Sequence, residues 1–98
     1  MTTAFSSFAP TGAVGGVASQ PSQALLLPTA GTPTIALVSN LGDIPVYVLM
    51  GTSSAVVVTT STGLPVLPNE KIALTIGSNT YIAILAAFGT PVQVNVGN

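Results

Sequence analysis

The stretch TPTIALVSNLGDIPVYVLMG at residues 32–51 can be laid without gaps on SNTYIAILAAFGTPVQVNVG at residues 78–97. In both copies a threonine precedes an apolar run, a turn containing glycine follows, and the pattern Pro-Val-x-Val leads to a closing glycine. Apolar runs of this length between turn residues are typical of strands. Each copy therefore predicts strand, turn, strand, although any two short hairpins share these features. Two such units suit a sandwich made of two related Greek-key halves, as in a jelly roll.

Short strands and turns continue through the rest of the chain, and no segment has a capped helical pattern of useful length. The predicted strands lie at residues 24–27, 34–41, 45–50, 55–60, 71–76, 80–88 and 91–96. Residues 61–69 hold two prolines, which predicts a corner rather than a strand. We therefore predict an all-β domain at residues 24–98. It is a small antiparallel β-sandwich, jelly-roll-like, with about seven to eight strands.

Residues 1–23 differ from the remainder, because Ser, Thr, Ala, Gly and Pro predominate and neither a helical nor a strand period is present. One interpretation is a flexible tail. The other is an extended arm whose Phe5 and Phe8 anchor in a neighbour's groove, since a flexible tail has no need of two large apolar rings. We predict that this N-terminal arm ends at residue 23. Residues 1–10 carry no Lys or Arg, which does not fit a secretory signal.

The composition points to a single domain that does not act as a free monomer. The chain has 98 residues, 48% of them hydrophobic, which excludes intrinsic disorder. Its three ionised side chains are Asp43, Glu70 and Lys71. About a quarter of an ordinary domain is charged, and so few charges promote self-association. No run of ~18 apolar residues is free of Gly, Pro, Asn or Asp, so the sequence predicts no membrane partner.

The side chains that carry most chemistry are missing from the sequence. There is no histidine to serve as general base or metal ligand, and no cysteine to serve as nucleophile. Glu70 and Lys71 adjoin in PNEK, and Asp43 follows a glycine, which predicts solvated turns for all three. One Lys and no Arg cannot neutralise the phosphates of a nucleic acid. We therefore expect no enzyme, no cofactor, no metal site and no nucleic-acid partner.

What remains for function is the surface. In residues 91–96, alternate valines face a core while the positions between them are polar. In residues 45–50 the positions between the core residues are Tyr47 and Leu49, and Val56 and Val58 add apolar side chains on the following segment. Contiguous exposed apolar area usually marks an interface. We predict that these four residues form a contact surface, unless a loop or the N-terminal arm of the same chain covers them.

Four pieces of the sequence resemble a known family. They are IALVSNLGDIPVYVLMG at 35–51, VVTTSTGLPVLPNEK at 57–71, TYIAILAAFGT at 80–90 and VQVNVGN at 92–98. Together they resemble the small, charge-poor β-sandwich proteins that tailed bacteriophages encode among their head genes. Those proteins are capsid decoration (cement) proteins or other head-associated components. The resemblance covers residues 34–98 and leaves the arm unmatched.

The resemblance implies a structural virion protein on the outer capsid surface, made in the cytoplasm of the host bacterium. Its partners would be the major capsid protein and further copies of the chain, as a trimer or a dimer. Because charges are so few, we expect attachment that resists raised salt.

Two alternatives belong to other classes of protein. A carbohydrate- or receptor-binding head fibre or adhesin module would need an exposed aromatic residue near polar groups, and Tyr81 near Asn79 is the local hint. A self-assembling pilin-like or surface-layer subunit would need an export route, which residues 1–23 do not visibly supply.

Overall fold

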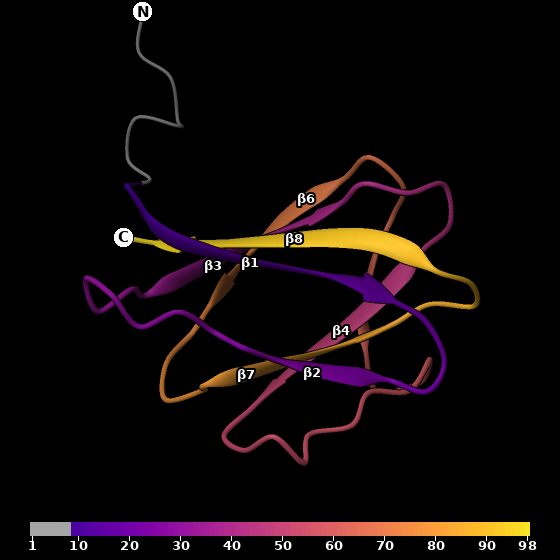
Figure 1. The fold of residues 1–98 in the computed structure, drawn as a ribbon, viewed down its shortest axis with the longest axis horizontal. Helices are drawn as coiled ribbons and strands as arrows, with labels where there is room; N and C mark the ends of the chain where they lie inside the picture. The colour runs from indigo at the N-terminus through magenta and orange to yellow at the C-terminus, as the bar shows by residue number, and fades with distance from the viewer. Residues whose placement is uncertain (1–8) are drawn as a thin grey trace, which may run out of the picture.

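The computed structural model describes residues 9–98 as two stacked antiparallel sheets of four strands each (Figure 1). The strands are β1 (Pro10–Ala18), β2 (Gln23–Leu26), β3 (Ile35–Asn40), β4 (Val46–Gly51), β5 (Leu64–Val66), β6 (Lys71–Thr75), β7 (Tyr81–Leu85) and β8 (Thr90–Gly97). The first sheet has the order β1-β8-β3-β6 and the second the order β2-β7-β4-β5. The predicted all-β sandwich is confirmed.

The strand order is that of a jelly roll. The first strand pairs with the last, the second with the seventh, the third with the sixth and the fourth with the fifth. The chain is therefore one long antiparallel hairpin, and successive strand pairs of this hairpin alternate between the two sheets. The additional pairings β3–β8 and β4–β7 complete each four-stranded sheet. Eight strands in two sheets with this wrapping form the jelly roll that the sequence predicts.

The internal repeat has a counterpart in this topology. Each strand can be replaced by the strand four places later, with the count continuing from β8 to β1. The order β1-β8-β3-β6 then becomes β5-β4-β7-β2, which is the order of the second sheet read backwards. The first copy supplies β3 and β4, and the second supplies β7 and β8. Neither copy is a hairpin, because each crosses from one sheet to the other. Instead the two copies pair with each other, through β3–β8 and β4–β7.

The core between the sheets consists of aliphatic side chains from alternate strand positions. On β4 and β8 the buried residues are Val46, Val48, Val92, Val94 and Val96. On the outer side of β8, Gln93 is exposed and Asn95 is half-buried. Both strands thus present the faces that their alternation predicts.

The predicted arm is wrong for residues 10–18, because these residues form β1 and pair with β8 along its length. Its strand period is hidden, since glycines hold two of the inward positions, Gly12 and Gly16. A Cβ on Gly12 would stand 3.0 Å from the Pro28 ring, and one on Gly16 would stand 3.3 Å from a Leu25 methyl. The sandwich therefore begins at Pro10, not at residue 24. Phe5 and Phe8 lie outside the described residues.

Two further predictions between β4 and β6 are wrong. Residues 55–60 are not a strand but part of a long connection, and β5 lies instead in the segment predicted to be a corner. β5 contains Pro65, which donates no hydrogen bond. β5 is an outer strand that pairs only with β4, and proline is tolerated at a sheet edge. The sequence pattern could not separate an outer strand with proline from a corner.

Candidate functional site

Four connections meet at one end of the sandwich. Because neighbouring strands are antiparallel, the β1–β2, β3–β4, β5–β6 and β7–β8 connections must lie together, at the right of Figure 1. We call this end, with residues 17–22, 41–45, 67–70 and 86–89, the turn end. The ends of the described chain, Ala9 and Asn98, lie at the opposite side and exchange two backbone hydrogen bonds.

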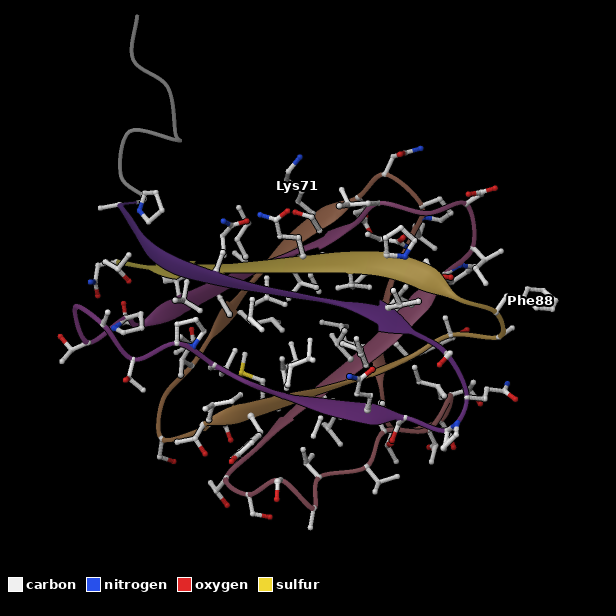
Figure 2. All side chains as sticks on the ribbon, viewed as in Figure 1. Lys71 and Phe88 are labelled. Carbon is white, nitrogen blue, oxygen red and sulfur yellow. The ribbon has the colours of Figure 1, made fainter. Side chains whose placement is uncertain are left out.

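The turn end carries four large exposed apolar side chains. Phe88 in the β7–β8 connection is 72% exposed and points away from the molecule (Figure 2). Leu41 is 55% exposed in the β3–β4 connection and Leu67 is 53% exposed in the β5–β6 connection. Val17, at the end of β1, is exposed beside Gly89. Exposed apolar side chains at one end of a domain usually mark an interaction site, so the turn end has the character of a contact surface.

A hollow of about 310 Å³ lies on the second-sheet side of the turn end. Its lining residues are Gln20, Ile44, Pro45, Tyr47, Thr60, Leu85, Ala86 and Ala87. A broader hollow of about 700 Å³ adjoins it and shares Gln20, Thr60 and Leu85. Most of the lining of the first hollow is apolar, and Gln20, Tyr47 and Thr60 are the lining residues whose side chains contain a polar group. The apolar surface of the turn end is therefore both raised, at Phe88, and recessed, at Tyr47.

Asn40 holds the turn end together from inside. Its side chain is buried, and its amide nitrogen donates to the carbonyl oxygens of Ile44 at 2.8 Å and Val66 at 2.9 Å. Its amide oxygen accepts the N–H of Gly42 at 2.9 Å. Its backbone carbonyl accepts the N–H of Asn69. One residue thus fixes the β3–β4 connection, β5 and the β5–β6 connection relative to one another.

The ionised side chains also lie at or next to the turn end. Asp43 is in the β3–β4 connection, Glu70 is in the β5–β6 connection, and Lys71 begins β6 (Figure 2). A carboxylate oxygen of Glu70 accepts the N–H of Leu67 at 2.9 Å, which shapes the turn. Within residues 9–98, no three side chains of His, Cys, Asp or Glu are grouped so that they could hold a metal ion. Residues 9–98 also include no helix that could span a membrane.

The four predicted contact residues on and beside the second sheet differ in how far they are exposed. Tyr47, Leu49 and Val56 are half-buried, and Val58 is only 2% exposed. Val58 is therefore not available to a partner, and its prediction as a contact residue is wrong. Of the four, Tyr47 belongs to the hollow of the turn end, whereas Leu49 lines a separate hollow near β6.

The cover on the second sheet comes from the chain itself. Residues 52–63, between β4 and β5, run along the outer side of this sheet, at the bottom of Figure 1. Val58 fills the space beside Gly63 together with Tyr47, and its N–H donates to the Ser22 hydroxyl at 3.4 Å. Ala83, on the outer side of β7, is fully buried. The apolar outer face of β4 is thus covered in part by a loop of the same chain.

The exposed apolar residues of the turn end were not recognised from the sequence. A signal was present, because Leu41 and Phe88 each stand directly before a glycine in the turn of a repeat copy. A large apolar side chain at a tight turn cannot easily reach the core. The two residues that suggested a sugar site, Tyr81 and Asn79, lie at the other end of the sandwich. Tyr81 is half-buried on β7, and the Asn79 side-chain amide donates to the Ile76 carbonyl at 2.9 Å.

Comparisons of the chain with protein-family models, with curated proteins and with solved structures found no match.

Proposed function

We propose that this chain is a structural, non-enzymatic virion protein. It is a capsid decoration (cement) protein that binds the outer surface of a tailed-phage head and stabilises the shell. The observation that carries the proposal is the turn end, where four connections of a jelly roll bring exposed apolar side chains together. The likeness of residues 34–98 to phage head proteins supplies the class of partner, which is the major capsid protein.

Attachment uses apolar contact and shape rather than charge. Phe88 enters a recess of the shell, and the hollow beside Tyr47 accepts a projection from it. Fully burying a phenylalanine side chain contributes roughly 2 kcal/mol, so a single contact is weak. Copies that associate with one another on the shell engage several capsid subunits together, and this multivalency strengthens attachment without new contacts.

The test is a binding experiment with heads of the phage that encodes the chain. Heads stripped of small outer proteins are mixed with the purified chain and sedimented, at low salt and in molar NaCl. We expect the chain to sediment with the heads equally in both buffers. Salt weakens attraction between charges, and this chain has only three charged side chains. The variant Phe88→Ser is expected to bind about thirtyfold more weakly, the equivalent of losing roughly 2 kcal/mol.

The matched control is Leu26→Ser, because Leu26 is also a large exposed apolar residue, 58% exposed, at the end of β2 away from the turn end. It is expected to bind as the parent chain does. Failure to sediment with the heads would refute the proposal, and release by moderate NaCl would refute the apolar mechanism.

A further inference from the structure

The four outer strands of the sandwich are not equally protected against pairing with another chain. Outer strands expose unpaired N–H and C=O groups, and proteins usually blunt them with shortness, lysine or proline. β5 has three residues and includes Pro65, and β6 has five residues and begins with Lys71. β2 has four residues and lies between Pro21 and Pro28. β1 has nine residues, no charge, and no proline after Pro10.

Among residues 9–98, the chain covers only the first part of β1. At that end the strand has a bulge before Gly12, and the β2–β3 connection packs against it. A Cβ on Gly31 of this connection would stand 2.8 Å from a Thr11 methyl. Past this point Ala13 and Gly15 are exposed and Val17 is 55% exposed. Within residues 9–98, no strand pairs with the outer edge of β1.

The register shows which backbone groups face this edge. Val17 lies opposite Pro91 on β8, and Pro91 has no N–H. The carbonyl of Pro91 accepts the N–H of Leu41, on the β3 side, at 3.0 Å. Val17 therefore exchanges no hydrogen bond with β8, and its N–H and C=O point outward. Hydrogen-bonded and non-hydrogen-bonded positions alternate in an antiparallel pair, so Gly15 and Ala13 also direct their backbone groups outward.

We propose that two copies of this chain form a dimer by pairing β1 with β1 in antiparallel register about Gly15. Ala13 of each copy lies opposite Val17 of the other, and Gly15 lies opposite Gly15. Each of the three facing pairs is joined by two backbone hydrogen bonds. The first sheet of one copy and the first sheet of the other become one continuous sheet of eight strands. A strand that pairs antiparallel with itself uses the same surface twice, which gives a closed two-fold dimer.

The chemistry of the edge favours a second copy as the occupant. No side chain among Ala13, Gly15 and Val17 is charged or larger than valine, so two identical strands approach without repulsion or steric conflict. The whole chain has a net charge of −1, which leaves little electrostatic repulsion between copies. Of these three residues only Val17 belongs to the turn end, and Phe88, Leu41 and Leu67 take no part in the contact. The dimer therefore does not depend on the proposed function. With so small an interface we expect Kd on the order of micromolar.

The test is the concentration dependence of the mass of the full chain, by sedimentation velocity. The parent chain is expected to pass from monomer to dimer as its concentration is raised a hundredfold. Gly15→Lys is expected to weaken the dimer by tenfold or more, because it places two like charges face to face at the two-fold axis. The fold accepts this side chain, since a Cβ at Gly15 has its nearest neighbour, the Val92 carbonyl oxygen, at 3.6 Å.

The matched control is Gln93→Lys, because Gln93 is the cross-strand neighbour of Gly15 on the same outer face of the sheet. It adds the same charge one strand away from the edge and is expected to leave the dimer intact. Circular dichroism of both variants establishes that they are folded.

Disulfide trapping tests the register directly, since the chain has no cysteine of its own. Facing hydrogen-bonded residues of an antiparallel pair have Cα atoms about 5.5 Å apart, within disulfide range. Gly15→Cys is expected to give a covalent dimer under a mild oxidant, and Gln93→Cys is expected to remain monomeric on a non-reducing gel. A monomer at every concentration, a dimer unaffected by Gly15→Lys, or equal cross-linking at both positions would each overturn the proposal.

Discussion

At the scale of single residues, Asn40 does the most to shape the turn end. A buried amide is costly unless its donors and acceptor are all used, and here they bond to Ile44, Val66 and Gly42. Its backbone N–H also donates to the carbonyl of Glu70. The exposed apolar side chains of the β3–β4 and β5–β6 connections are displayed from turns that this residue holds.

Asn40→Ala is expected to lower the free energy of unfolding by roughly 3 kcal/mol, because one buried and two partly buried backbone groups lose their partner at once. Chemical denaturation of the parent and the variant measures the difference. Asn95→Ala is the control, since Asn95 lies on the outer face of β8 and its amide oxygen accepts one long bond, 3.4 Å, from Gln93. The control should differ from the parent by less than about 0.5 kcal/mol. Equal losses in the two variants would show that the amide network does not stabilise the turn end.

At the scale of elements, the connection formed by residues 52–63 covers part of the outer face of the second sheet. It is anchored by a single buried side chain, Val58, while its neighbour Val57 is 64% exposed. The anchor packs where a Cβ on Gly63 would stand 2.6 Å from it, so only glycine fits at that position. This arrangement explains why β4 has no polar face in the sequence: its outer residues are partly covered by the loop.

Val58→Ala is expected to lower the free energy of unfolding by roughly 2 kcal/mol and to loosen residues 52–63, because it removes two methyl groups from the loop's buried anchor. Hydrogen exchange of peptides spanning the loop, read by mass spectrometry, checks the loosening. Val57→Ala makes the same chemical change at an exposed position and should leave both quantities nearly unchanged. If the loop peptides of the two variants show equal hydrogen exchange, Val58 does not anchor the loop.

At the scale of the whole molecule, the fold is a long hairpin with an internal two-fold relation between its halves. Every strand of the first half has a topological counterpart in the second, and Ala9 and Asn98 are hydrogen-bonded to each other. A chain that begins in the β4–β5 connection would therefore alternate between the sheets as the natural one does, with the first and second sheets exchanged. The order of the two halves along the chain is not what holds the sandwich together.

A circular permutant that runs from Ser53 to Asn98 and then from Met1 to Thr52 is expected to fold to the same structure. Residues 1–8 serve as its linker, and the loss of stability should be no more than about 2 kcal/mol, since one connection is opened and another closed. Circular dichroism and thermal unfolding check both expectations. A second permutant, opened between Gly42 and Asp43, cuts the connection that Asn40 ties and should be much less stable. A permutant opened at Ser53 that fails to fold would contradict the equivalence of the halves.

The amino-acid sequence by itself determined the all-β class, the jelly-roll-like sandwich, the repeat and the inward faces of β4 and β8. These features depend on alternation and turn residues, which are local and can be read in short windows. Composition determined that the surface would be nearly uncharged.

Only the tertiary structure decided which segments became outer strands and what covered the second sheet. β1 has glycine at inward positions, so it carries no alternating signal and is a strand because β8 pairs with it. Residues 55–60 are rich in β-branched side chains yet form a loop, because the outer position beside β4 is taken by β5. The turn end also escaped prediction, since Leu41, Leu67 and Phe88 are far apart in sequence. Pairing between distant segments brings them together, and no local pattern encodes it.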